Sequence, residues 1–209
     1  MWGAKKREAA ALERQQMAQS LGLVCSESVA DGIDWLAYTL PSRQRRVVGD
    51  VVAGRFGHHD VMLFDLWTQR PPEPLEGLAG ESFASYAVEH TVVVVGLAGD
   101  VDRVMLTPRH DWRGLRPRDT PLLQVTGNDW LDAVFTVEAR NPSYATALDD
   151  QGFAYAASQL PHPSTIELTQ THLVCAHWVL PIDEQATYLR AAVLLAQAVP
   201  PAAFRPPPS

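Results

Sequence analysis

The chain has 209 residues, 46% of them hydrophobic, and carries a net charge of −7 at pH 7. This length and apolar content are enough for one domain with a sizeable core. The acidic balance excludes a general nucleic-acid-binding protein, which relies on a basic surface. The two cysteines, Cys25 and Cys175, are too few for a disulfide framework and indicate a reducing compartment.

The first residues combine a tryptophan, Trp2, with the basic cluster Lys5, Lys6 and Arg7. This pattern is typical of the cytosolic edge of a membrane span, because tryptophan prefers the lipid–water interface and basic residues the cytosolic side. A native start with a charged helical turn explains it equally well. No apolar run is long enough to cross a bilayer, and the N-terminus lacks the apolar core of a secretory signal. We therefore expect the chain in the cytoplasm or at the cytoplasmic side of the inner membrane.

A helix is predicted over residues 5–21, which are rich in strong helix formers and contain no proline. Its apolar stripe is thin, running through Ala10, Met17 and Leu21, so we expect a surface helix that ends at Gly22. A strand is predicted next, over residues 34–40.

The central hairpin is predicted over residues 46–68. A valine-rich run leads into it, and Gly54 and Gly57 permit the positive φ angles of a tight turn. The returning strand is apolar on both faces, which predicts a strand that is covered on both sides. Two acidic residues interrupt the apolar runs of the hairpin, Asp50 in its first arm and Asp65 in its second, and we expect them at a sheet end or on a solvated face.

Two further hairpins are predicted. One joins residues 82–95 to residues 101–107, and the other joins residues 165–169 to residues 172–179. Between the hairpins lie a proline-rich loop, an irregular basic segment and two shorter strands, at residues 69–81, 108–121, 122–126 and 135–139.

Helix starts are clearest in the C-terminal third. Asn141 precedes Pro142, Asp150 is placed to cap a second short helix, and Asp183 is predicted to cap a long apolar helix that ends before Pro200. The fold class is therefore α+β, with an antiparallel sheet of about six to eight strands built from hairpins and packed by the C-terminal helix. We expect an N-terminal helix over residues 1–22, one domain over residues 23–204, and a disordered tail over residues 205–209.

Histidines provide the candidates for metal chemistry. His58 and His59 stand beside Asp60, and His110 precedes Asp111. Neighbouring residues on a strand point to opposite faces, so these pairs favour a solvated loop over a metal site. Cys175 and His177 share a strand face, an arrangement that either activates a thiol or packs both side chains in the core.

The arginines after the second hairpin form the candidate partner-binding segment. A basic patch on an acidic protein suits anionic lipid headgroups or an acidic partner, whereas a solvated loop with local salt bridges is the simpler alternative. Trp130 favours a contact role, because tryptophan and arginine are common interface anchors. The assigned residues are Arg103, Arg109, Trp112, Arg113, Arg116 and Arg118. We assign no catalytic residue, cofactor or metal.

The order of segments from about residue 18 to residue 204 resembles a family of actinobacterial α+β domains, many of them tethered by an N-terminal membrane helix. The segments that carry the resemblance are Leu21-Gly22-Leu23, Gly54-Arg55, Val61-Met62-Leu63-Phe64-Asp65, Phe135-Thr136-Val137, Ala145 to Leu148, and Val199-Pro200. In layout the chain is similar to a mycobacterial accessory factor for trehalose monomycolate transport. The family supplies no catalytic residues that carry over to this sequence.

The basic start of the chain and the absence of a recognisable reaction centre in the sequence predict a non-enzymatic interaction domain that binds a membrane protein. The resemblance implies that this domain serves cell-envelope lipid transport. The proline-rich residues 70–74 are a further expected contact. Two alternatives stay open. One is a small metal-dependent hydrolase that uses His58, His59, His110 or His177, and the other is a lipid- or ligand-binding domain whose cavity is roofed by the last helix.

Overall fold

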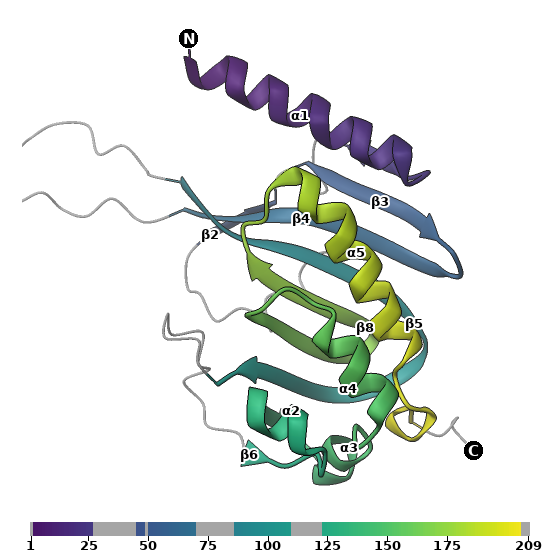
Figure 1. Cartoon of the computed structure of the whole chain (residues 1–209). Coiled ribbons are helices and arrows are strands. Elements are labelled where there is room, and N and C mark those ends of the chain that lie inside the picture. The colour runs from purple at the N-terminus through teal and green to yellow at the C-terminus, as the bar shows by residue number, and fades with distance from the viewer. Residues whose placement is uncertain (1, 27–44, 49, 70–85, 110–122, 206–209) are drawn as a thin grey trace, which may run out of the picture.

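The computed structural model describes residues 2–26, 45–48, 50–69, 86–109 and 123–205 (Figure 1). These residues form one eight-stranded antiparallel sheet with helices packed on it, which confirms the predicted α+β class. The helices are α1 (Trp2–Ser20), α2 (Asp129–Val134), α3 (Pro142–Thr146), α4 (Gln151–Ser158), α5 (Ile182–Gln197) and the 3-10 turn η2 (Pro201–Ala203). The strands are β1 (Val24–Ser26), β2 (Arg45–Val48), β3 (Val51–Phe56), β4 (His59–Gln69), β5 (Tyr86–Pro108), β6 (Leu123–Gln124), β7 (Phe135–Ala139) and β8 (Ser164–Trp178).

The predicted central hairpin is present as β3 and β4, which pair from Val52 and Leu63 to Phe56 and His59. Gly57 in its turn has a φ of +63°, as a tight hairpin requires. The preceding valines belong to a separate strand, because β2 pairs with the far end of β4. Within the described residues, the path through the sheet is β1-β3-β4-β5-β7-β6, with β2 added to β4 and β8 added to β5.

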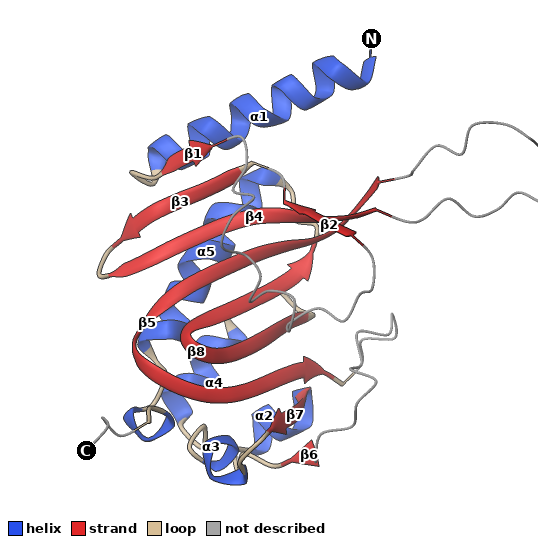
Figure 2. Cartoon of the chain, turned by 180° about the vertical axis from the view of Figure 1, so that it is seen from behind, coloured by secondary structure: helices blue, strands red, loops and turns tan. Residues whose placement is uncertain are grey.

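The two longest strands, β5 and β8, run antiparallel to each other through a shared bend (Figure 2). His90 near the start of β5 pairs with Trp178 at the end of β8, whereas Leu106 pairs with Ile166 near the start of β8. Each strand corresponds to one of the hairpins predicted after the central one. The prediction of two separate hairpins is therefore wrong. The two arms of each predicted hairpin form one continuous bent strand, and the two bent strands, β5 and β8, pair with each other.

The bend is longer on β5 than on β8. Gly96 pairs with His172, and Val101 pairs with Gln170. Between these two pairs the chain advances five residues along β5 but only two residues along β8. The longer path places β5 on the outside of the turn, with β8 nested inside it (Figure 2). Phe204 bridges to Val101 at this bend, so the segment that follows η2 is anchored there.

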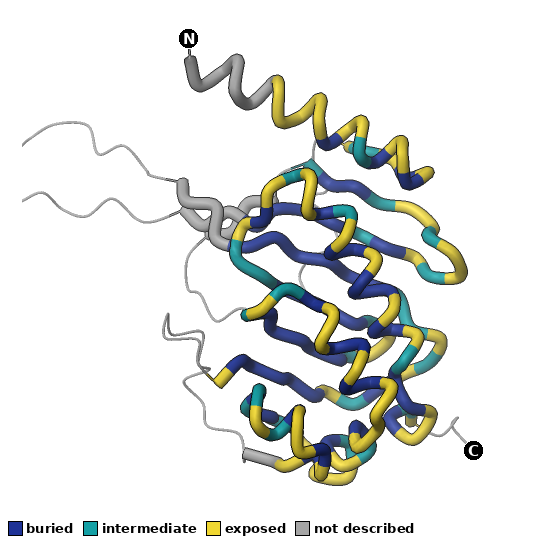
Figure 3. The backbone as a smooth tube through the Cα atoms, in the orientation of Figure 1, coloured by how far each residue is buried: buried dark blue, intermediate teal, exposed yellow. Residues whose placement is uncertain are grey.

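The main core lies between the sheet and α4 and α5, which cover one face (Figures 1 and 3). A second buried cluster lies on the opposite sheet face. Neighbouring residues of β4 enter the two clusters, and both Leu63 and Phe64 are fully buried. The prediction of a strand covered on both sides is confirmed. The expectation that Asp65 lies on a solvated face is wrong, because its exposure is 7%.

The C-terminal part of helix α1 packs on the rest of the fold. Arg14, Ala18 and Leu21 are buried, whereas residues 9–13 are exposed (Figure 3). Gly22 has a φ of +70°, and the Leu23 N–H donates to the Ala18 carbonyl at 2.8 Å, which ends the helix as predicted. Within the described residues, no helix combines the length and the hydropathy needed to cross a bilayer.

Two of the predicted helix caps are confirmed. Asn141 accepts from the Ser143 N–H at 3.1 Å, and Asp150 accepts from the Phe153 N–H at 2.9 Å. The cap predicted at Asp183 is wrong, because α5 begins at Ile182 after Pro181 and Asp183 lies inside its first turn. The strand predicted over residues 34–40 and most of the proline-rich loop lie outside the described residues.

Candidate functional site

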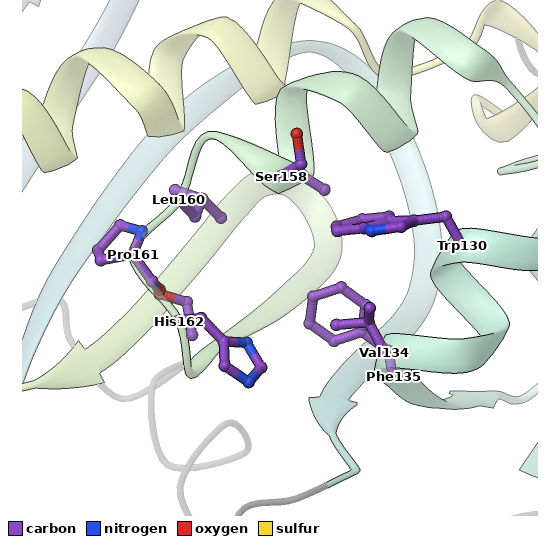
Figure 4. Close-up of a pocket in the computed structure, with 9 residues that line it drawn as sticks. Trp130, Val134, Phe135, Ser158, Leu160, Pro161 and His162 are labelled. Carbon is purple, nitrogen blue, oxygen red and sulfur yellow. The ribbon is translucent and has the colours of Figure 1, made fainter.

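The candidate site is a pocket of about 210 Å³ beside α2 and the end of α4 (Figure 4). Figure 4 shows Trp130, Val134 and Phe135 on one side, facing Leu160, Pro161 and His162 on the other. The remaining lining residues are Ala157, Ser158 and Ser164. The chain therefore brings α2, β7, α4 and the start of β8 together around one small apolar hollow.

The Trp130 wall is positioned by the short helix α2, which the sequence did not predict. The Asn128 side chain caps this helix by accepting from the Trp130 and Leu131 N–H groups, both at 3.2 Å. The Trp130 ring meets the Phe135 ring edge-on at a centroid distance of 6.0 Å. Trp130 is 38% exposed although most large apolar side chains are buried. Its indole is therefore supported from behind and open toward the pocket.

The opposite wall offers no free hydroxyl donor. The Ser158 hydroxyl donates to the Tyr155 carbonyl at 2.7 Å, and the Ser164 hydroxyl donates to the Pro161 carbonyl at 2.5 Å. Both hydroxyls are satisfied by the backbone, so the pocket presents chiefly carbon to an occupant. Its titratable lining group is the exposed His162.

Arg109 is the predicted contact residue that adjoins this pocket. Its backbone N–H donates to the Val134 carbonyl at 2.9 Å, and its Nε donates to the Phe135 carbonyl at 3.0 Å. Two of the lining residues are thereby tied to the end of β5. The exposed guanidinium of Arg109 supports the pocket wall from outside the cavity.

Arg103 lies elsewhere, on the second arm of β5. Its Nε donates to Glu167 Oε1 at 2.6 Å, and Glu167 is completely buried. Arg109 follows Arg103 by six steps of extended chain, which correspond to about 20 Å. Glu138 is on the neighbouring strand, and burial raises the pKa of its carboxyl although the positive charge of Arg103 opposes the shift. The other assigned residues, Trp112, Arg113, Arg116 and Arg118, lie outside the described residues.

The predicted histidines do not meet in one place. His58 is exposed, and His59 Nδ1 lies 2.8 Å from the Gly96 carbonyl oxygen. His177 Nδ1 lies 2.7 Å from the Trp178 carbonyl oxygen, at the far end of the sheet. Among the residues that the structure describes, no group of three possible metal ligands occurs, and His110 falls outside them.

Cys175 and His177 share a strand face, as predicted, and both approach Tyr188 of α5. The His177 ring meets the Tyr188 ring edge-on at 6.1 Å. Complete burial raises the pKa of the Cys175 thiol well above its usual value. Burial also raises the pKa of Cys25, with a further contribution from Asp50. Both thiols are therefore protonated at neutral pH, the opposite of what an activated nucleophile requires.

The sequence indicated two parts of this site, since Trp130 was considered as a contact residue and Arg109 was assigned. It missed Leu160, Pro161 and His162, because they reach the pocket through the packing of α4 beside α2. The Asn128-Asp129 pair was the available signal, as asparagine before an acidic first turn is a typical helix start.

Comparison with known proteins gives one structural likeness to report. The fold is similar to the crystal structure of the mycobacterial trehalose monomycolate transport factor A, with a TM-score of 0.64. The match covers 96% of this chain and 98% of that chain, at 16% sequence identity. No protein-family model matches the sequence, and no curated protein matches it. The likeness shows a shared fold from end to end, and it confirms the resemblance in layout inferred from the order of segments.

Proposed function

We propose that the chain is a non-enzymatic interaction domain that serves trehalose monomycolate transport. The observation that carries this proposal is the end-to-end fold match, which spans 96% of this chain and 98% of the chain in the transport factor's crystal structure. This coverage means that the two chains correspond over nearly all of their compared lengths. A shared role as an accessory factor follows more naturally from such a match than from one shared module.

The chemistry of the candidate site supports a binding role. The pocket is walled by Trp130, Phe135, Leu160 and Pro161, and its two serine hydroxyls are engaged by backbone carbonyls. Such a surface stabilises an apolar contact and offers little to a reacting polar bond. The buried Cys175, with its raised pKa, is likewise suited to packing.

Location at the cytoplasmic side of the inner membrane is part of the proposal. Trp2 and the basic cluster Lys5, Lys6 and Arg7 are the residue types found where a chain leaves a bilayer on the cytosolic side. The partner in this account is a membrane protein of the same transport assembly, and the basic cluster contacts anionic headgroups.

Depletion of the protein in its native host tests this function. We expect newly made, isotope-labelled trehalose monomycolate to accumulate in the inner membrane, because an accessory factor of its transport is missing. Re-expression of the wild-type chain is the control. An unchanged distribution of the labelled glycolipid after depletion would refute the proposal.

A further inference from the structure

We propose that the Trp130 pocket holds one large apolar side chain from a basic cytosolic segment of the membrane-protein partner. This inference rests on the proposed function, because it identifies the surface through which the interaction domain holds that partner. The occupant is a leucine, methionine or phenylalanine side chain, and its neighbours in the partner are lysines or arginines.

The size of the pocket decides between a small-molecule ligand and a side chain. Its volume is about 210 Å³. Pockets that enclose a whole small molecule usually measure about 300–1,000 Å³. The Trp130 pocket is therefore too small for a complete lipid or cofactor, whereas one large side chain fits. A ligand cavity roofed by the last helix was the earlier expectation, but α5 lines no part of this pocket.

The composition of the walls fits an energetically important contact. Tryptophan is enriched among the residues that contribute most to binding at the centre of protein interfaces. Trp130 is 38% exposed here, and Phe135 and the Asn128 cap hold it in place. Because Ser158 and Ser164 donate to carbonyl oxygens, an entering apolar side chain breaks no hydrogen bond.

The charges around α2 indicate which residues should flank the inserted side chain in the partner segment. Asp129, beside Trp130, is exposed, as are Asp149 and Asp150. Asp132 Oδ2 accepts from the Gly127 N–H at 3.1 Å, and a Cβ placed on Gly127 would lie 3.1 Å from Asp149 Oδ2. Asp132 and Asp149 thus meet at Gly127, within one turn of Trp130. No ion pair within the described part of the chain neutralises these carboxylates.

The exposed guanidinium of Arg109 adjoins the pocket wall at Phe135 and offsets one of these charges, and the four carboxylates outnumber it. Charge complementarity therefore favours a basic partner segment. Cytosolic loops of membrane proteins are enriched in lysine and arginine close to the bilayer. A segment of that kind, with one large apolar residue, matches both the pocket and its acidic surroundings. Long-range attraction between the two would raise the association rate, while the inserted side chain would slow dissociation.

The test uses the full chain and a pair of matched variants on α4. Ser158→Phe places a ring in the pocket, whereas Gln159→Phe adds the same ring at an exposed neighbour that does not line it. The probes are synthetic peptides that cover the cytosolic segments of membrane proteins co-purifying with the wild-type chain from its native host. We expect Ser158→Phe to weaken the binding of one such peptide at least about tenfold, as loss of a central contact does. We expect Gln159→Phe to bind like the wild type.

Two further measurements keep the result interpretable. Addition of the peptide to the wild-type chain should shift the indole N–H resonance of Trp130, whatever the variants do to stability. Asp129→Lys should weaken binding, and the effect should fade at high salt. The inference is overturned if Ser158→Phe binds as tightly as the wild type, or if decanoic acid shifts the Trp130 resonance while no peptide does. If no membrane protein co-purifies with the wild-type chain, both this inference and the proposed function as an interaction domain for a membrane protein are refuted. If a partner binds equally well to Ser158→Phe, only the inference fails.

Discussion

Arg14 of α1 and Asp65 of β4 form an ion pair whose side chains retain only 8% and 10% of their exposure. The same carboxylate accepts from the Thr91 hydroxyl at 2.8 Å, and Gln185 Nε2 lies 3.4 Å from it. One acidic side chain thus joins α1, β4, β5 and α5. This network ties the C-terminal part of α1 to the sheet and to α5.

Asp65→Asn should lower the free energy of unfolding by about 3–5 kcal/mol, because it leaves the buried charge of Arg14 without its counter-ion. Urea denaturation of the purified chain measures this loss. Asp60→Asn is the control, since Asp60 is exposed on the same strand. Replacing both partners, with Arg14→Met and Asp65→Leu, should restore much of the stability. Equal stability of the two asparagine variants would show that the ion pair contributes nothing.

Gly22→Ala should destabilise the docking of α1 by about 1–2 kcal/mol, the usual cost of a left-handed conformation at a residue with a Cβ. Gly22 has a φ of +70°, and a Cβ there meets no atom within 4 Å, so the cost is confined to the backbone. Hydrogen exchange of the α1 amides measures the effect. Gln19→Ala, at an exposed helical position, should leave exchange unchanged, and similar exchange in both variants would argue against a strained helix end.

The two thiols should react slowly in the folded chain. Burial raises the pKa of Cys175 far above its usual value and also raises the pKa of Cys25. A raised pKa reduces the thiolate fraction at pH 8, and the thiolate is the reactive form. We expect iodoacetamide to leave Cys175 unmodified and to modify Cys25 slowly, whereas both react readily in denaturant. Rapid modification of Cys175 in the native chain would restore the case for a nucleophilic thiol.

His172 should make stability depend on pH. Burial lowers the pKa of its imidazole from the usual 6.5. The unfolded chain therefore binds a proton at a higher pH than the folded chain does. The contribution of neutral His172 to the free energy of unfolding is complete above pH 6.5. It declines as the pH falls from 6.5 toward the lowered pKa of His172 in the folded chain. His172→Gln should flatten this decline in urea-denaturation curves, whereas His58→Gln, at an exposed position, should not. An unaltered decline in His172→Gln would assign the dependence to other groups.

Local patterns in the sequence identified the elements whose determinants are local. Residues 135–139 form β7 as predicted, and the caps at Asn141 and Asp150 are in place. The nesting of β5 and β8 was missed, because turn residues at the two bends also fit ordinary hairpins. The burial of Asp65 was missed for a similar reason. Its partner Arg14 is 51 residues away, and no local pattern links the two.

In the candidate site, too, the sequence predicted what depends on single residues and missed what depends on packing between elements. Trp130 and Arg109 were considered because tryptophan and arginine are common at interfaces, a property of single residues. The pocket depends on how α2 and α4 pack, and neither the existence of α2 nor that packing followed from the periodicity of apolar residues. The separation of Arg103 from Arg109 was likewise decided by the length of β5, since Arg103 lies within this strand and Arg109 directly follows its end.

The central claim is that this chain serves trehalose monomycolate transport by holding a membrane partner at the Trp130 pocket. The most direct test measures labelled trehalose monomycolate in the inner membrane of a depleted native host that re-expresses the wild type, Ser158→Phe or Gln159→Phe. The account predicts accumulation after depletion, correction by the wild type and by Gln159→Phe, and persistent accumulation with Ser158→Phe. A distribution that stays the same after depletion would contradict the account.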